Sequence, residues 1–141
     1  MNIRPMLQKD YEEITKLIID ELGYPNQNFE DVYKRLDIIA KSNNHKTFVA
    51  HINDTAVGFI GLCKIVTYEE DEHIRILTLA VSLKYQRQGI GKALLTSAEE
   101  YAEENHIKNM KVSCAFHRTT SHLFYEANGF VRSSFSFFKE L

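Results

Sequence analysis

The chain has 141 residues, a formal net charge of −2 and a hydrophobic fraction of 44%. This length predicts a single folded domain over residues 1–141, and the composition excludes a largely disordered chain. The basic residues are dispersed rather than gathered in a stripe, so nucleic acid is not an expected partner. Residues 1–5 contain charge and proline before any long apolar stretch, which predicts a cytoplasmic protein with neither a signal peptide nor a membrane span.

Two helices are predicted in the first forty residues. Asp10 precedes an apolar series at helical spacing from Ile14 to Leu22, Glu13 fits a capping-box partner for Asp10, and Gly23 can end this helix. Asn28 can cap a second helix after a short turn. The expected buried face of this second helix consists of Phe29, Val32, Leu36 and Ile39.

Three strands are then predicted from residues that favour β-structure. Residues 47–52 and 56–66 form an expected antiparallel pair, joined by the polar connection 53–55. Residues 74–81 are apolar and rich in β-branched side chains, which is typical of a central strand covered on both faces.

The second half of the chain predicts a helix from Ile90 to about Asn105 and a strand over residues 110–116. A last helix contains residues 123–127, and residues 130–138 favour a final strand. The expected order is β-α-α-β-β-β-α-β-α-β. Such an order predicts an α/β fold in which a mixed, largely antiparallel central sheet is flanked by helices.

Residues 86–92, Gln-Arg-Gln-Gly-Ile-Gly-Lys, lie between a predicted strand and a predicted helix, where free backbone N–H groups favour an anion. Gly89 and Gly91 would let a phosphate approach the backbone and permit unusual dihedral angles. A dinucleotide fingerprint requires a small residue in place of Leu94, and a Walker loop requires serine or threonine in place of Ala93. The turn therefore predicts a phosphate site of another kind, and the alternative is a helix that merely begins with glycines.

At Gln86, Gly89 and Gly91 the sequence resembles the GNAT superfamily of N-acetyltransferases, whose pattern is Gln or Arg, two residues, Gly, one residue, then Gly or Ala. Residues 123–130, Leu-Phe-Tyr-Glu-Ala-Asn-Gly-Phe, are similar to the family's C-terminal signature. The expected element order also matches, so the resemblance covers essentially the whole chain. It implies transfer of an acetyl group from acetyl-CoA to a primary amine by direct attack in a ternary complex.

The resemblance also implies where the co-substrate binds. A bulge at residues 79–81 would splay the strand from its neighbour, so that the pantetheine arm of CoA adds hydrogen bonds in the gap. Arg118 stands where the family often has asparagine, and it can pair with a CoA phosphate or cap the strand end by a salt bridge. The expected cofactor-binding residues are Leu79, Ala80, Val81, Gln86, Arg87, Gln88, Gly89, Ile90, Gly91, Lys92, Arg118 and Tyr125.

Tyr125 is the expected acid for the departing thiolate, because its family counterpart often has this role; a structural core tyrosine is the alternative. The glutamate that many relatives carry on the fourth strand is absent here. Glu72, His73 and Glu21 are therefore the candidate bases, directly or through an ordered water. Cys114 lies in an apolar stretch, which disfavours a covalent acetyl-cysteine route, and neither cysteine has the spacing of a metal site.

The acidic residues of segment 68–72 are expected beside the acceptor cleft, where they would attract a cationic amine such as a polyamine, an aminoglycoside or a lysine-like group. A solvated loop is the alternative. Two other functions compete: a non-catalytic acyl-CoA-sensing module, and a toxin acting on charged transfer RNA, which the lack of a basic face disfavours. Phe135, Phe137 and Phe138 fit a homodimer contact, the acceptor cleft or core packing.

Overall fold

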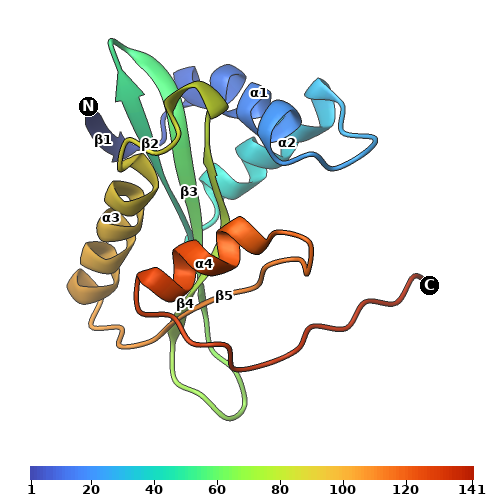
Figure 1. Ribbon diagram of the computed structural model, residues 1–141, viewed down its shortest axis with the longest axis vertical. Helices are drawn as coiled ribbons and strands as arrows, with labels where there is room; N and C mark the ends of the chain where they lie inside the picture. Colours follow the sequence, from blue (N-terminus) through green and yellow to red (C-terminus); the bar gives the residue numbers. More distant parts are fainter. The chain divides into compact units, whose positions relative to one another are not determined.

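A computed structural model describes residues 1–141 as two compact units, Met1–Lys111 and Val112–Leu141. A five-stranded sheet has the strand order β1-β2-β3-β4-β5 (Figure 1). The last residue of β5, Val112, is the first residue of the second unit. None of the helices is long and apolar enough to span a membrane. The elements are β1 Asn2–Pro5, η1 Gln8–Asp10, α1 Tyr11–Glu21, α2 Phe29–Lys41, β2 His45–Ile52, β3 Thr55–Ile65, β4 His73–Val81, η2 Leu83–Tyr85, α3 Ile90–Glu104, β5 Met110–Val112 and α4 Thr119–Ala127.

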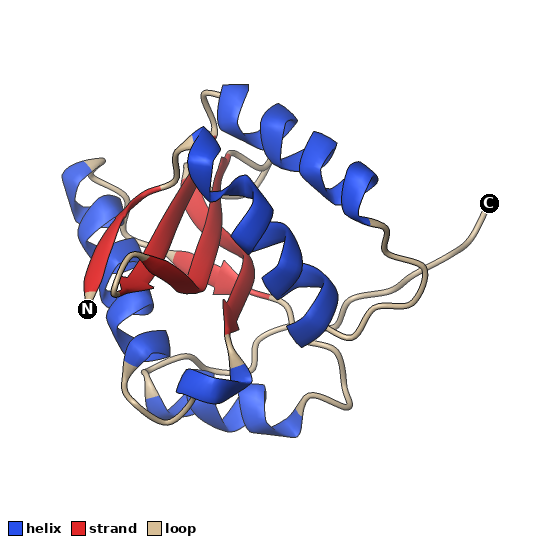
Figure 2. Ribbon diagram, turned by 90° about the horizontal axis from the view of Figure 1, so that it is seen from above, coloured by secondary structure: helices blue, strands red, loops and turns tan.

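In the first unit, strands β1 to β4 pair antiparallel with their neighbours, as the sequence predicts. The β2–β3 turn has positive φ at Asn53 and at Asp54, 50° and 63°, which is the backbone of a tight hairpin turn. Val49 and Phe59 contribute to a core shared with α1 and α2, whereas Phe48 contacts Tyr101 of α3. The sheet is therefore covered on both faces, with α3 on one side and α1 and α2 on the other (Figures 1 and 2).

The helix starts differ in how well the sequence predicts them. Asn28 caps α2 as expected, because its Oδ1 accepts a hydrogen bond from the backbone N–H of Asp31 at 2.9 Å. The capping box predicted for the first helix is wrong. Glu13 Oε2 accepts a hydrogen bond from the backbone N–H of Ala56 at 3.1 Å, and Asp10 makes no cap bond to the helix. Both carboxylates are used in tertiary contacts instead.

Asp10 is the centre of a buried polar cluster that joins α1 to β1 and β2. Its two carboxylate oxygens accept hydrogen bonds from Arg4 at 2.7 and 2.9 Å, and Leu7 donates its backbone N–H at 2.8 Å. His51 Nε2 lies 3.1 Å from the same carboxylate. Burial acts to raise the pKa of Asp10, but the hydrogen bonds from Arg4, Leu7 and His51 outweigh it and lower the pKa to about 2.

This lowered pKa predicts an acid-dependent loss of stability. A depressed carboxyl pKa contributes stability above the unfolded-state value of 3.8 and loses it as the pH falls through about 2. The advantage of wild type over Asp10→Asn in the free energy of unfolding should shrink by about 2 kcal/mol between pH 5 and pH 2. Urea titrations at the two pH values measure it. Asp37, which is half-exposed and paired with Lys41, supplies the control Asp37→Asn, which should show a much smaller change. Equal changes would contradict the prediction.

In the second unit, β5 ends at Val112, so the strand predicted over residues 110–116 is too long. The carbonyl oxygen of Ala115 accepts hydrogen bonds from the backbone N–H of Arg118 at 3.1 Å and from His122 Nε2 at 2.9 Å. These bonds form a turn that leads into α4. The carbonyl of Ala115 is used in this turn and therefore does not bond to a neighbouring strand. Gly129 ends α4 with φ of 91°, and Phe130 donates its N–H to the carbonyl of Tyr125 at 3.0 Å.

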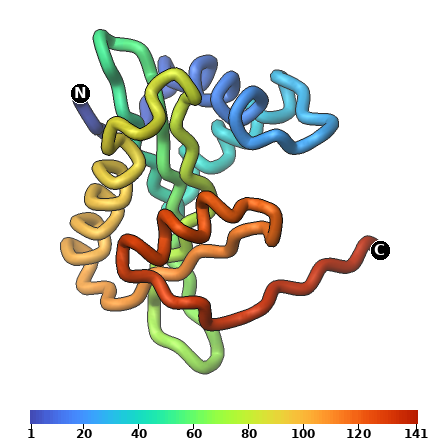
Figure 3. The backbone as a smooth tube through the Cα atoms, in the orientation of Figure 1, coloured from blue at the N-terminus to red at the C-terminus, as the bar shows by residue number.

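The final strand predicted over residues 130–138 is absent. Residues 131–141 are exposed and belong to no helix or strand, and the chain leaves the end of α4 as an extended tail (Figure 3). A strand requires a neighbour for its backbone N–H and C=O groups, and a composition that favours β-structure does not supply one.

Candidate functional site

The sheet has two register shifts, one between β2 and β3 and one that forms a bulge in β4. Leu62 pairs with Ile76 and Gly61 pairs with Thr78, so Leu77 is an extra residue that faces no partner on β3. The side chain of Leu77 is exposed although it is large and apolar. The bulge expected at residues 79–81 is therefore present, but two residues earlier than the resemblance implies.

The edge of β4 that faces away from β3 is largely unpaired. The nine residues of β4 lie beside a β5 of only three residues, so most of that edge has no strand partner. Leu79 and Val81 are half-buried there and Ala80 is buried. A strand edge without a strand partner can offer backbone N–H and C=O groups to an extended ligand.

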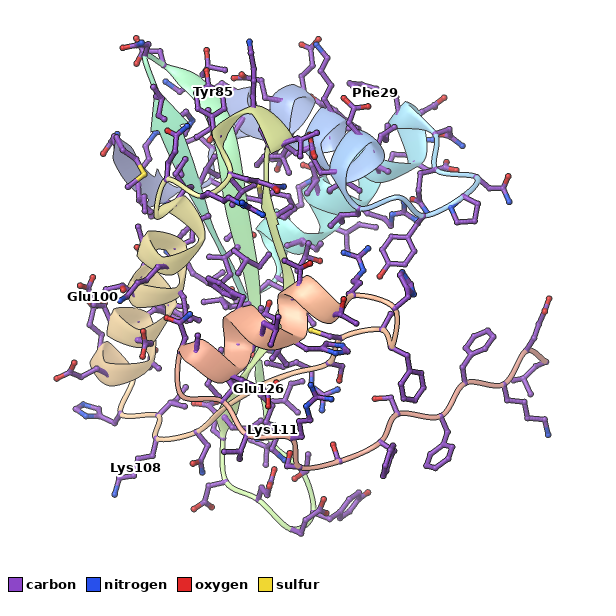
Figure 4. The ribbon with its side chains drawn as sticks, viewed as in Figure 1. Phe29, Tyr85, Glu100, Lys108, Lys111 and Glu126 are labelled. Atoms are coloured by element: carbon purple, nitrogen blue, oxygen red, sulfur yellow. The ribbon has the colours of Figure 1, made fainter.

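The turn after β4 is fixed by hydrogen bonds to the two central strands. Ser82 donates its backbone N–H to the carbonyl of Val57 at 2.8 Å, and Gln86 Nε2 donates to the carbonyl of Val81 at 3.0 Å. The amide of Gln86 thus anchors the turn to the end of its own strand, a role the sequence did not reveal. Arg87 and Gly89 both have positive φ, 63° and 80°, which is costly for arginine and free for glycine. Figure 4 labels Tyr85 at this end of the sheet.

The N-terminus of α3 has the geometry and the charge that favour an anion. Its N-cap residue is Gly89, no side chain caps the helix, and no acidic residue lies in the first turn. The first backbone N–H groups of a helix have no partner within it, and the helix dipole adds positive charge there. The charged residues of segment 82–92 are all cations: Lys84, Arg87 and Lys92.

The two glycines of the turn have different roles. Gly89 needs its left-handed backbone, as expected, and a Cβ there would meet no atom within 4 Å. Gly91 lies inside α3 and is not among the glycines with positive φ, so the unusual dihedral angle expected for it is absent. The lack of a side chain is what Gly91 contributes. Ile90 is buried at 3% exposure, which leaves its backbone as the part that faces the turn.

Gly58 on β3 sets how closely α3 approaches the sheet. A Cβ at this position would lie 2.9 Å from the carbonyl oxygen of Ala80 and 3.3 Å from Leu94 Cδ1. The sequence interpretation missed this residue, although an isolated glycine within an apolar strand is a known sign of a close backbone approach. Gly58 therefore lets the start of α3, where the candidate anion site lies, pack closely against the end of β4.

Replacing Gly58 with alanine should destabilise the protein by about 1–3 kcal/mol, because the added methyl group must push back the backbone of β4 or the start of α3. Gly61 offers a matched control on the same strand, since a Cβ there meets nothing within 4 Å. Gly61→Ala should change stability by less than about 0.5 kcal/mol. Urea unfolding of both variants measures the difference, and an equal effect would show that Gly58 is not a packing constraint.

The candidate bases lie away from the bulge. His73 is 1% exposed, and its Nδ1 lies 3.1 Å from the carbonyl oxygen of Asp71 and 3.8 Å from Glu70 Oε2. His73 is four residues from Leu77, or roughly 13 Å along a strand. Glu72 is exposed and one residue farther, and Glu21 ends α1. His73 and Glu72 therefore lie too far away to contact an amine at the bulge directly. A role for either residue through ordered water stays a prediction.

The acidic segment 68–72 is the tip of the β3–β4 hairpin, at the opposite end of β4 from the glycine turn (Figure 1). Lys111 Nζ binds both carboxylate oxygens of Glu70, at 2.6 and 2.7 Å, and this pairing lowers the pKa of Glu70. Lys111 is labelled far from Tyr85 in Figure 4. One acidic residue of the segment is thus neutralised within the unit.

Tyr125 lies in the second unit, buried at 7% exposure, and its ring contacts those of Phe124 and Phe130 at centroid distances of 5.3 Å. Burial raises its pKa, the nearby Cys114 adds to the increase, and Arg118 opposes it. The phenol therefore keeps its proton at neutral pH. Burial also raises the pKa of Cys114, which counts against a nucleophilic thiolate. Arg118 is the N-cap residue of α4.

The model of the Acetyltransferase (GNAT) family matches residues 7–130. The chain belongs to this family. It is an acyltransferase of the N-acetyltransferase class, and its mixed, mostly antiparallel sheet with helices on both faces is the family's fold, as predicted. A curated GNAT relative is the uncharacterized N-acetyltransferase YhdJ of Bacillus subtilis (strain 168), 25% identical over 113 residues, which cover 79% of this chain and 80% of the relative.

Solved structures agree with this assignment. A GNAT family acetyltransferase of Staphylococcus aureus superposes with a TM-score of 0.82 at 28% identity and covers 99% of this chain and 98% of its own. The aminoglycoside acetyltransferase AAC(6')-Iy, in complex with the bisubstrate analogue CoA-S-monomethyl-acetylneamine, superposes with a TM-score of 0.85 at 17% identity, covering 99% of this chain and 97% of its own. The second likeness shows the fold alone.

Proposed function

We propose that this GNAT family chain transfers the acetyl group of acetyl-CoA to a primary amine in a ternary complex. The observation that carries the proposal is the N-terminus of α3. It has no side-chain cap, lies in a segment whose only charges are positive, and is joined to the bulged strand β4 by residues 82–89. Few ligands combine a pyrophosphate with a long arm of amide groups. An anion site joined to an open strand edge fits both parts of CoA.

The CoA pyrophosphate would accept hydrogen bonds from the backbone N–H groups of residues 89–92, with Arg87 and Lys92 adding positive charge. The pantetheine arm would lie along the open edge of residues 79–81, and the thioester would reach the bulge at Leu77. Arg118 is proposed as a partner for a CoA phosphate, because its guanidinium can bind two phosphate oxygens at once.

The proposed reaction is a direct acyl transfer. The neutral amine nitrogen attacks the thioester carbonyl carbon, the C–S bond of the resulting tetrahedral intermediate breaks, and the departing sulfur takes the proton of the Tyr125 hydroxyl. The new amide nitrogen releases its proton to water, with Glu72 or His73 as acceptors farther along. The Tyr125 phenolate takes a proton back from solvent, which restores the acid. Burial keeps Tyr125 protonated, as a general acid requires.

The proposed acceptor is a small cationic amine or a peptide amine. Glu69, Asp71 and Glu72 are exposed at the hairpin tip, whereas Glu70 is paired with Lys111, so the tip keeps a negative field that attracts cations. A soil-metagenome aminoglycoside acetyltransferase in complex with sisomicin has the same fold, with a TM-score of 0.78. A cationic acceptor is consistent with that likeness.

Replacing Gly91 with tryptophan tests the co-substrate site. A bulky side chain in the first turn of α3 should block the approach of the pyrophosphate and weaken acetyl-CoA binding at least tenfold by calorimetry. Thr96→Trp, at an exposed position of the same helix, is the matched control and should bind normally. If Gly91→Trp binds acetyl-CoA as well as wild type does, the pyrophosphate lies elsewhere.

Replacing Tyr125 with phenylalanine should lower kcat by about 100-fold, because it removes the proton donor, and should leave the Kd for acetyl-CoA nearly unchanged. Release of CoA from acetyl-CoA in the presence of an amine panel measures both the activity and the acceptor class. Tyr101→Phe, on α3 against Phe48, is the control for loss of a hydroxyl. Equal kcat values for Tyr125→Phe and wild type would refute the acid role.

The same panel distinguishes the sensor alternative. Spermidine, an aminoglycoside and a lysine peptide should be acetylated faster than neutral amines of similar size. Tight acetyl-CoA binding without CoA release for any amine, in wild type and Tyr125→Phe alike, would instead identify a non-catalytic acyl-CoA-sensing module.

A further inference from the structure

The two faces of the sheet differ in how well they are covered before the bulge. Phe59 and Ala80 pair across β3 and β4 and belong to the core shared with α1 and α2, so the residues that alternate with Phe59 along β3 face α3. On the α3 face, the side chains between the hairpin and the bulge are at most 2% exposed: Leu62, Ile74 and Ile76. α1 and α2 lie at the other end of β4 from the hairpin (Figure 1).

The face opposite α3 is therefore less covered beside the bulge. Gly61 lies on it, and a Cβ at this position would meet no atom within 4 Å. The bulged Leu77 is 46% exposed, Cys63 is half-buried, and Arg75, which pairs with Cys63, is exposed. An acceptor that brings its amine to a thioester at Leu77 from this face would lie beside Arg75.

Arg75 is the only charged residue between the bulge and His73 on β4, and its charge is not used within the chain. It forms no ion pair and donates no hydrogen bond. Its charge helps to lower the pKa of Glu70, but Lys111 binds both oxygens of that carboxylate. The five N–H donors of the Arg75 guanidinium are therefore available to a ligand.

The position of Arg75 suits the anionic group of a small acceptor. It is two residues from Leu77, or roughly 7 Å along the strand, which is the scale of an amino acid. A guanidinium binds a carboxylate through two parallel hydrogen bonds. Beyond Arg75, the exposed acids of the hairpin tip favour a positive charge: Glu69, Asp71 and Glu72. From the bulge outward, β4 and its hairpin thus offer places for an amine, a carboxylate and a second amine.

We propose that Arg75 determines the acceptor's specificity, and that the acceptor is a diamino acid whose free carboxylate binds to its guanidinium. The side-chain amine would attack the thioester at the bulge, and the α-amino group would face the hairpin tip. This inference rests on the proposed acetyl transfer and narrows its acceptor to one chemical class. A polyamine or an aminoglycoside has no carboxylate and would place positive charge against Arg75.

Lysine, lysinamide and cadaverine form a matched series, since each has two amines and only lysine has a carboxylate. With wild type, kcat/KM from CoA release should be about tenfold higher for lysine than for the other two. Arg75→Gln should remove this preference, and Arg75→Lys, which keeps the charge without the two-pronged geometry, should retain part of it.

Lys64→Gln is the control for loss of a nearby cation, because Lys64 pairs with Ile74 and so lies on the α3 face of the same two strands. It should leave the preference for lysine unchanged. A wild type that acetylates the three amines equally well, or a preference that Lys64→Gln lowers as much as Arg75→Gln does, would overturn the inference while leaving the proposed acetyl transfer in place.

Binding of the acetylated product provides a readout that needs no turnover. In the presence of CoA, wild type should bind Nε-acetyl-lysine about tenfold more tightly than Nε-acetyl-lysinamide by calorimetry, and Arg75→Gln should bind the two equally. CoA release from no amine would refute the proposed reaction, and the two affinities would then decide separately whether Arg75 binds a carboxylate. Equal affinities in wild type would overturn the inference.

Discussion

Gly58 lets α3 lie against the sheet at a distance that no side chain would permit, with the carbonyl of Ala80 and the side chain of Leu94 closing over the bare backbone. The direction of α3 decides where its first N–H groups point, and these groups are the proposed phosphate ligands. Hydrogen bonds from Ser82 and Gln86 then fix the turn to β3 and β4. The site is thus held by rigid elements, as accurate positioning requires.

Charge is distributed along the first unit in a way that the net value of −2 conceals. The turn at one end of β4 carries only cations, and the β3–β4 hairpin at the other end carries mainly acids. An anionic cofactor and a cationic acceptor would therefore be drawn to opposite ends of one strand, with the bulge between them. Within the β3–β4 ladder, the bulge is the one place where a residue of β4 has no partner on β3.

The fold class and the approximate bounds of the helices and strands from α1 to α3 could be predicted from the sequence, because hydrophobic periodicity and glycine turns are local signals. The errors occur where tertiary contacts decide. Asp10 has the position of a helix cap, but Arg4 and His51 take its carboxylate. The prediction of a final strand was wrong because a strand forms only beside another strand, and residues 130–138 pair with none in the single chain. The glycine turn was recognisable, whereas Gly58 and the position of the bulge depend on registers between strands that a linear pattern does not contain.

The proposed phosphate ligands at the start of α3 are main-chain N–H groups, which most substitutions leave in place. Truncating Gln88 to alanine removes atoms but leaves every N–H group in place, so an alanine scan would pass over the backbone groups proposed to bind the pyrophosphate. Sequence variation can therefore be wide at that exposed position. Sequence variation should be narrow at Gly89, whose left-handed backbone admits few other residues. It should also be narrow at Gly58, where a Cβ would meet the carbonyl of Ala80, although Gly58 contacts no proposed ligand.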